Sequence, residues 1–465
     1  MAMIANAQCE DDARLRLTVR EDKRRPLQPW HADTAAGRLT LSGELATDLS
    51  FARREALGTG EPPVKHWQWN QEADFEAFLM INPNLSVFAQ VRGAQELRRS
   101  AISAGTRGMR FLERGEFWVR AETESLPRWS FEVGRLHFED ERRWWWDAEL
   151  DGLRLAWEGE HADLSVALAQ EILPARSNES HVAASQEGIL RILLEGAWNP
   201  FKEQTFEFFA LHHSDRSAAQ REGLVLANRR ADPSDARLTW AGARWMGAQH
   251  FGHEGLMGYW LDGAYLTGND TRGVYEPHAP GESEVTSVRR RSVRGWSFDA
   301  GAHLLLPLAL EPRLFAGHAK GSGGSSNGPR DHAFRQSGLA PNESGFGGVQ
   351  RFPHYGLALN PELSNISITT LGVGITVAES SSLDLVYHHY RMVNTSGELC
   401  ASGLDLTLDG VHRNLGWGLD LVLALEERER LEFEFTAAYF QADKTLGTDA
   451  NRSSVSAMGA VRWAF

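Results

Sequence analysis

Apolar and polar residues alternate one by one in many short stretches of this chain. The stretches Leu85–Gly93, Glu116–Glu122 and Gly152–Glu158 each place aliphatic or aromatic residues at every second position and polar or charged residues between them. The last stretch, Ser453–Phe465, follows the same pattern and finishes on an aromatic residue. Side chains of an extended strand point alternately to its two faces. The sequence therefore predicts many β-strands that each have one apolar and one polar face.

The bulk composition excludes a membrane protein built from helices. Mean hydropathy is −0.38 over 465 residues, and no apolar run reaches the length of about 18 residues that a helical span requires. A strand of a membrane β-barrel shows apolar residues to lipid only at alternate positions, so the same numbers permit a barrel. The 44 Gly and 16 Trp suit tight lumen packing and aromatic belts, and the formal charge of −14 argues against nucleic acid as a partner.

The connections between the strands alternate in length. From Gly37 onward we count about 18 stretches with strand character. Short connections such as Gly159–Ala162 and Glu426–Arg430 alternate with longer ones such as Asn269–Arg291 and Gly321–Glu362. This regularity is typical of barrels with short periplasmic turns and long extracellular loops. The sequence thus predicts an all-β fold, a transmembrane antiparallel up-and-down β-barrel that the final strand closes against the first.

The expected domain organisation has two parts. Residues 1–36 form a residual signal and N-terminal periplasmic segment, in which Ala5-Asn6-Ala7 resembles a signal-cleavage site. A flexible tail and a segment folded into the pore both fit the part after this site. Residues 37–465 form the barrel, with its longest loop at 321–362 and both chain ends on the periplasmic side. The two cysteines, Cys9 and Cys400, are too few for a disulfide framework.

An ordered set of segments carries a resemblance to a known family. Val133–Leu155 places a Gly-Arg pair at a strand end and three tryptophans before Asp147, and it resembles the alginate-export family of outer-membrane porins. The resemblance continues, in order, through Gly115–Val119, Leu238–Gly242, Tyr259–Gly268, Ala319–Leu339, Ser382–Val393 and Ala401–Leu423. It implies an 18-stranded barrel in the bacterial outer membrane. Its basic constriction would pass an acidic exopolysaccharide, an alginate-like polyuronate, from the periplasm to the cell exterior.

Two departures from the family concern how such a pore would be gated. The family's alginate porin has a long periplasmic loop that plugs the pore before the penultimate strand, whereas this chain has only Glu426–Arg430 there. The outer loop Arg98–Leu112 is also shorter than the expected lid. A more permissive channel and closure by another loop, such as Gly321–Glu362, are both compatible with these lengths.

Cationic residues at successive depths would suit such a cargo, because a polyuronate carries one carboxylate per sugar. Arginine matches a carboxylate with a planar fork and stays charged. The same charges are also compatible with structural Arg–Glu ladders across the lumen. Face parity selects Arg92, Arg120, Arg154 and Arg462, and the resemblance to the family adds Arg135, His137, Asp147 and Arg351 as residues of the substrate path.

Other chemistry is weakly supported. Trp144–Trp146 lies in an outer loop beside a strand end, which favours anchoring at the membrane interface over sugar stacking. The pairs His212-His213 and His388-His389 cannot chelate one metal ion, because neighbouring strand residues face opposite ways. Hydrolysis by Glu139 and Asp147 would need a separation that the sequence does not reveal. We therefore expect no metal, no cofactor and no enzymatic activity.

The sequence predicts a monomeric, anion-selective export channel that sits in outer-membrane lipid, and docking of periplasmic secretion proteins is compatible with it. Two alternatives stay open. One is a general porin that takes up small anions such as uronate oligomers, and the other is a non-conducting barrel that anchors a periplasmic polysaccharide complex. The cargo, the direction of flow and the gating loop do not follow from the residues.

Overall fold

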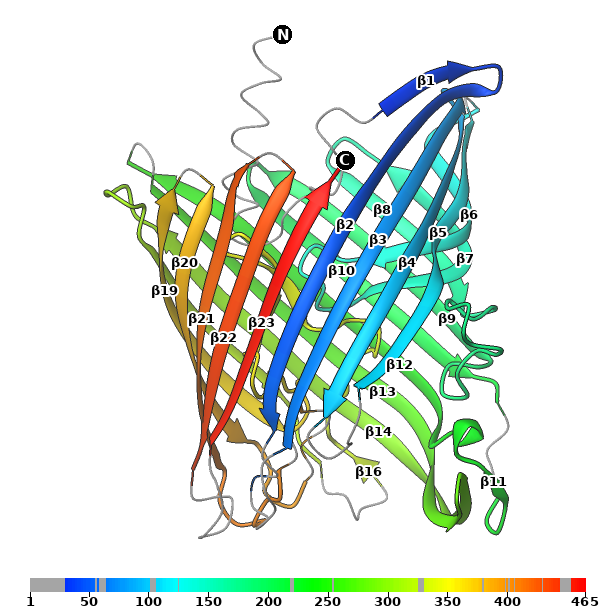
Figure 1. The fold of residues 1–465 in the computed structure, drawn as a ribbon, viewed down its shortest axis with the longest axis vertical. Coiled ribbons are helices and arrows are strands. Elements are labelled where there is room, and N and C mark those ends of the chain that lie inside the picture. Colours follow the sequence, from blue (N-terminus) through cyan, green and yellow to red (C-terminus); the bar gives the residue numbers. More distant parts are fainter. Residues whose placement is uncertain are drawn as a thin grey trace.

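The computed structural model describes a single antiparallel β-barrel in which each strand pairs with its neighbours in chain order (Figure 1). The described part contains no helix long and apolar enough to cross a membrane. It comprises residues 30–465 except 55–56, 58–63, 101–105, 124, 218–220, 253–254, 325–329, 379, 398, 400–401, 405, 429 and 444–452.

The barrel wall has 18 strands, as the sequence predicts. In chain order they are β2 (Gly37–Arg54), β3 (Val64–Asn82), β4 (Leu85–Ser100), β5 (Thr106–Thr123), β6 (Leu126–Glu139), β7 (Asp147–Glu158), β8 (Ala162–Gln170), β9 (Ile189–Phe201), β10 (Gln204–Asp215), β12 (Ser234–Phe251), β13 (Gly255–Ala279), β14 (Glu282–Leu305), β15 (Arg313–Gly321), β19 (Ile366–Ala378), β20 (Ser381–Met392), β21 (Asn414–Arg428), β22 (Leu431–Ala442) and β23 (Ser453–Ala464).

The first and last wall strands close the barrel. β2 and β23 are antiparallel, and Gly43 and Phe465 exchange two backbone hydrogen bonds of 3.0 and 2.9 Å. Closure pairs the backbone N–H and C=O groups along the edges of the first and last wall strands. The membrane interior requires this pairing because it offers no water to these groups. A short strand, β1 (Trp30–Thr34), continues the same edge of β2 beyond this point by pairing with residues 37–41. Expectations about Cys9 and the signal fall outside the described residues.

Alternation along the strands places apolar residues toward lipid and polar residues toward the lumen. Phe117 is 55% exposed and Trp463 is 46% exposed, both on the outer wall. Their neighbours Glu116 and Arg462 instead line an internal cavity. The predicted two-faced strands are confirmed at these positions. The pattern arises because lipid accepts apolar side chains, while charged ones are retained only toward water.

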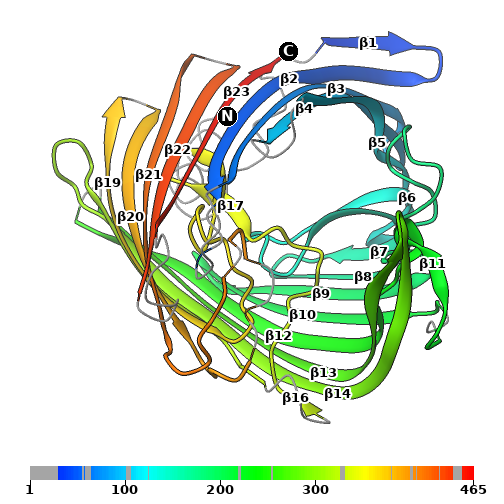
Figure 2. The same ribbon diagram turned by 60° about the horizontal axis from the view of Figure 1, so that its bottom comes forward.

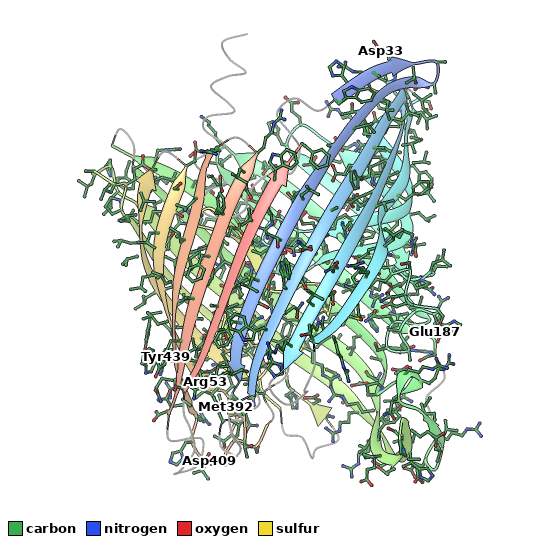
Figure 3. The ribbon with its side chains drawn as sticks, viewed as in Figure 1. Asp33, Arg53, Glu187, Met392, Asp409 and Tyr439 are labelled. Atoms are coloured by element: carbon green, nitrogen blue, oxygen red, sulfur yellow. The ribbon has the colours of Figure 1, made fainter. Side chains whose placement is uncertain are left out.

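The two ends of the barrel differ as expected. Asp33 lies at the same end of the barrel as the C-terminus, and Asp409 lies at the opposite end among the longer connections (Figure 1 and Figure 3). The prediction of a long loop at Asn269–Arg291 is wrong. β13 and β14 continue as a paired hairpin to a turn at Pro280-Gly281, and β11 (Val225–Ala227) pairs with it. Strands that extend beyond the lipid need no apolar face, so the apolar pattern could not reveal them.

The long connection between β15 and β19 folds into the barrel instead of covering it from outside (Figure 2). It contains β16 (Arg330–Asp331), which pairs with β14, and a hairpin of β17 (Glu343–Phe346) and β18 (Val349–Pro353). We call residues 322–324 and 330–365 the inner segment. The loop between β6 and β7, residues 140–146, packs against it.

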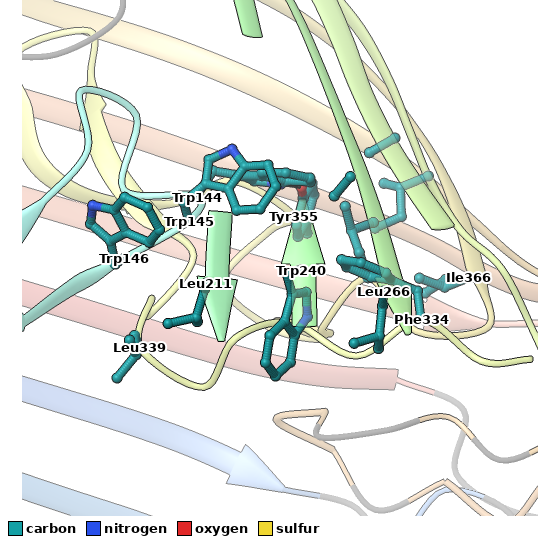
Figure 4. Close-up of a cluster of buried hydrophobic side chains, with 14 of the residues drawn as sticks. Trp144, Trp145, Trp146, Leu211, Trp240, Leu266, Phe334, Leu339, Tyr355 and Ile366 are labelled. Atoms are coloured by element: carbon teal, nitrogen blue, oxygen red, sulfur yellow. Dashed lines mark hydrogen bonds between the residues drawn. The ribbon is translucent and has the colours of Figure 1, made fainter. Parts of the chain in front are cut away.

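Trp144, Trp145 and Trp146 belong to this internal packing, with exposed fractions of 1–3% (Figure 4). The expected role of these tryptophans as interface anchors is therefore wrong. Trp145 stacks on Phe209 with ring centres 5.0 Å apart, and Trp144 contacts Tyr355 of the inner segment. The three rings fill the lumen on the side of β9–β14, because their loop turns inward from the strand end. Together with the inner segment, they divide the barrel interior.

Candidate pore site

An open cavity of about 360 Å³ lies between the β17–β18 hairpin and the wall formed by β2–β7 and β23. Most of its lining is polar or charged. The lining side chains include those of Glu44, Asp48, Glu72, Asp74, Glu76, Gln90, Arg92, Glu113, Glu116, Arg135, His137, Arg143, Asp147, Glu149, Glu343, Gln350, Arg351 and Arg462.

Carboxylates outnumber guanidinium groups in this lining. Ten residues are Asp or Glu, five are Arg, and one is His137. The cavity is therefore formally acidic, whereas the sequence predicts an arginine-lined lumen. Six of the eight predicted path residues do line it, and the two others, Arg120 and Arg154, do not.

Arg92 is held at the centre of the wall by carboxylates from several strands. Its guanidinium contacts Glu149, Asp74 at 3.4 Å and Glu113 at 3.6 Å. Glu149 also accepts from Nε of Arg135 at 3.4 Å, so one carboxylate joins two arginines. These pairs link β3, β4, β5, β6 and β7 and match the structural-ladder alternative for Arg92.

Three other predicted arginines are also engaged. Arg462 pairs with Glu434 at 2.5 Å. Arg120 lies near three glutamates at 3.1–3.6 Å, outside the cavity. Arg154 pairs with Glu132 at 3.3 Å, and its guanidinium lies 4.8 Å from the centre of the Phe138 ring. The N–H donors of these three arginines are engaged by carboxylates of the protein, so the arginines stabilise the wall.

Two arginine side chains of the cavity have N–H donors without a partner among the described residues. Arg351 is exposed to the cavity and forms no ion pair or hydrogen bond within the described part of the chain. Arg135 is 6% exposed, and its Nη1 is buried with no hydrogen-bond partner among the described residues. A buried donor without a partner is rare in folded proteins and calls for an acceptor. Both groups line the same cavity.

The position of Arg351 follows from how its hairpin is anchored. Val349 and Phe352 pack with Val386, Val422 and Ala424 of the wall, which leaves Arg351 facing away from that cluster. The adjacent Gln350 side chain donates to Glu432 at 2.6 Å.

The hairpin turn itself requires glycine. Gly347 has φ +58°, and a Cβ there would lie 2.3 Å from an Asp384 carboxylate oxygen. Only a residue without a side chain allows the turn to approach the wall this closely. The turn therefore fixes the depth to which the inner segment enters the lumen.

His137 and Asp147 meet at the extracellular side of the cavity. His137 Nε2 and an Asp147 oxygen are 2.7 Å apart, and Arg143 lies 3.7 Å from the same carboxylate. The β6–β7 connection thus brings together two of the predicted path residues. Arg143 was not among the predicted residues, although it lies in the same motif.

A second charged cluster, which the sequence analysis missed, lies buried behind the cavity. Arg244 is fully buried and contacts Asp262 at 2.5 Å, Asp140 at 2.6 Å and Glu207 at 3.0 Å. Arg142 of the β6–β7 loop also pairs with Asp262. The sequence signal that could have revealed this cluster is the presence of charged residues at lumen-facing positions of otherwise apolar strands. The cluster ties the loop to β10, β12 and β13.

His354 joins the inner segment to the same loop. Its Nε2–H donates to the Arg142 carbonyl at 2.9 Å, while the Ser344 hydroxyl lies 3.4 Å from Nδ1. Burial, with a smaller contribution from the Arg142 charge, lowers the pKa of His354 to about 4. The imidazole is therefore neutral at neutral pH, as its hydrogen bonds require.

The closed wall of 18 strands, its apolar exterior and its charged interior define an outer-membrane porin-type barrel. Solved structures agree with this class. OccK7 (OpdD) of Pseudomonas aeruginosa superimposes with a TM-score of 0.58 at 11% identity, covering 93% of this chain and 99% of that one. OccK5 (OpdH) of the same organism gives a TM-score of 0.54 at 10% identity, covering 91% and 98%. Such low identities bear on the fold alone.

Residues 38–460 match the model of the family described as "Alginate export", and the chain belongs to that family of bacterial outer-membrane proteins. Curated relatives include the alginate production protein AlgE of P. aeruginosa, 24% identical over 83% of this chain and 79% of the relative. AlgE of Pseudomonas syringae pv. tomato is 23% identical over 69% of this chain and 67% of the relative.

Proposed function

We propose that this protein is a channel that conducts an alginate-like polyuronate from the periplasm to the cell exterior. Membership of the alginate export family and the porin-type barrel support a transport channel rather than an enzyme. The observation that supports the cargo is the exposed, unpaired Arg351 in an open cavity, with the incompletely paired Arg135 as a second charge in the same lining. We further propose that the channel works as a monomer.

The arrangement of charges suits transient contact with a polyanion. Each guanidinium offers a fork that matches a uronate carboxylate. The excess carboxylates of the lining repel the same polymer, so attraction is confined to the neighbourhood of Arg135 and Arg351. A conduit must admit its cargo without retaining it. In this proposal Arg92 and Arg462 shape the wall, Arg351 contacts the passing chain, and Arg135 adds positive charge to the same stretch of the route.

The inner segment acts as the partition that narrows the channel. It takes the place that the family's periplasmic plug loop would otherwise fill, since that connection is only a short turn here. With the β6–β7 loop, it leaves the polar cavity beside β2–β7 as the route for a single extended chain. Polymer on this route passes Arg351 on the partition and Arg135 on the wall.

Current recordings test the role of these residues. The purified protein is inserted in a planar bilayer, and brief current blocks caused by oligouronates are counted. We expect the double variant Arg135→Gln/Arg351→Gln to reduce the block frequency at least fivefold. Arg120→Gln is the matched control, because Arg120 lies outside the cavity, and it should leave the frequency unchanged. Equal block frequencies in all three proteins would refute the proposed contact.

The direction of flow needs a cellular measurement. Deletion of the gene in a polymer-producing host should trap or degrade the polymer if the channel exports it. Loss of growth on uronate oligomers, with secretion intact, would instead support uptake. The buried packing of Trp144–Trp146 against the inner segment favours one second candidate, a non-conducting scaffold for a periplasmic polysaccharide complex. The absence of any single-channel current would support that candidate.

A further inference from the structure

Five cationic side chains project from the outer wall at the extracellular end of the barrel. They are carried by β12, β14, β15 and β20, and in the wall β13 lies between the first two of these strands and β19 between the last two (Figure 1). These residues are Arg237, Arg290, Arg294, Lys320 and Arg391. Their positions share the outward parity of exposed residues such as Trp296, which is 44% exposed. They therefore face the membrane side and not the lumen.

Three of these arginines surround one point on the wall. Asn269 pairs with Arg237 on one side and with Ser292 on the other, so Arg237 lies two strands, or about 10 Å, from Ser292. Arg290 and Arg294 flank Ser292 on the same face of β14. The polar Asn269 and Ser292 lie between the three charges. This arrangement offers several donors to one anionic group.

The remaining two cations form a neighbouring position. Lys320 lies with its Nζ 5.7 Å from the centre of the Trp296 ring, and Trp296 is two residues from Arg294. Ser367 pairs with Lys320 on one side and with Arg391 on the other. The five side chains thus form one basic patch across six neighbouring strands, β12 to β15, β19 and β20.

The patch begins where the apolar surface ends. Along β14 the outward residues from Leu304 to Trp296 are apolar or aromatic, and this run spans about 26 Å along the strand. Arg294 is the next outward residue. An aromatic residue followed by a cation marks the border between hydrocarbon and headgroups. The basic patch therefore lies at the headgroup level of the outer leaflet.

The protein itself supplies little neutralising charge. None of the four arginines forms an ion pair or a side-chain hydrogen bond within the described residues. Asp235 is an acidic residue of the same face whose charge acts on Arg237 and Arg290, but it forms no ion pair within contact distance with either among the described residues, so one carboxylate faces five cations. The lumen arginines, in contrast, are mostly paired. Charges gathered without partners at a lipid border are expected to bind anions there.

We propose that this basic patch binds the phosphorylated headgroup of lipopolysaccharide in the outer leaflet. One phosphate is held among Arg237, Arg290 and Arg294, and a second lies between Lys320 and Arg391. The acyl chains then run down the apolar surface past Trp296. The site lies outside the barrel and is independent of the proposed cargo.

Native mass spectrometry of the full-length protein in detergent tests this binding. The probes are deep-rough lipopolysaccharide and the same lipid after removal of its phosphates. We expect the intact lipid to bind at least fivefold more than the dephosphorylated one. Arg290→Gln/Arg294→Gln should lose this preference. Arg289→Gln/Arg291→Gln is the matched control on the same strand with the opposite parity, and it should keep the preference.

Equal binding of the two lipids to the wild-type protein would overturn the proposal, whether or not the variants fold. Equal loss in both double variants would also overturn it, because the effect would not depend on the outer face. Phosphatidylglycerol and inorganic phosphate serve as competitors. Displacement of the lipopolysaccharide by either at comparable concentration would show a general anion site and contradict the specific one.

Discussion

The indole Nε1 of Trp144 donates a hydrogen bond to the hydroxyl of Tyr355 at 2.7 Å, and this hydroxyl donates in turn to Asp299 at 3.0 Å. The contact joins the β6–β7 loop to the inner segment and both to β14, although the first two residues are 211 positions apart. Each group is buried. This chain of hydrogen bonds explains how the β6–β7 loop and the inner segment are held together inside the barrel.

Loss of this hydroxyl should loosen the partition. Tyr355→Phe leaves the Trp144 N–H without its acceptor in a buried place, which costs about 1–3 kcal/mol. We expect larger and more frequent fluctuations of single-channel current. Tyr265→Phe, at an exposed outer position, is the control and should behave as wild type. Identical current traces for Tyr355→Phe and wild type would show that the contact does not hold the partition.

Removal of the central buried arginine should be more damaging. Arg244→Met leaves the carboxylates of Asp140, Asp262 and Glu207 without a shared cation, and breaking a buried network of this kind costs about 3–5 kcal/mol. The expected result is a lower temperature at which the folded band disappears in heated gel samples. Arg229→Met, at an exposed site, should leave that temperature unchanged. An unshifted transition for Arg244→Met would contradict the structural role of the cluster.

Acid should weaken the docking of the inner segment through His354. Its folded-state pKa is lowered to about 4, below the usual value of 6.5, so the undocked segment binds the proton more readily. Docking is therefore fully stable above about pH 6.5 and loses about 1.4 kcal/mol per pH unit as the pH falls toward 4. Protonation would place a charge beside Arg142, with Asp299 and Asp140 as the nearby acids.

The readout for this prediction is channel conductance between pH 7 and pH 4. We expect conductance to rise with acidification in the wild type and to rise much less in His354→Gln, because glutamine cannot take up the proton. The His354→Gln variant is the control for carboxylates that titrate in the same pH range, because it retains them. Parallel curves for the two proteins would assign the pH dependence to groups other than His354.

Much of the wall could be predicted because lipid imposes a strict period of two on every strand. Phe117 and Trp463 face outward and Arg92 and Arg462 face inward, as their parity indicates. The alternating pattern of the final strand likewise predicts that this strand closes the barrel. The hairpin extension of β13 and β14 escaped prediction because strands beyond the membrane carry no such constraint.

The interior could not be predicted in the same way. Parity places a residue on the lumen side but does not say which loop turns inward, so Trp144–Trp146 were expected at the surface. It also does not reveal pairing between distant strands. Arg92 and Arg462 are consumed by carboxylates, while Arg351 keeps its charge available, and only the three-dimensional contacts separate these cases.

Transport through the reconstituted barrel tests the central claim most directly. Lipid vesicles containing the purified protein are loaded with oligouronates or with neutral oligosaccharides of the same length, and efflux of each is measured. We expect the oligouronates to leave at least fivefold faster than from protein-free vesicles, and faster than the neutral chains. Retention of the oligouronates, or equal efflux of charged and neutral chains, would contradict a polyuronate channel.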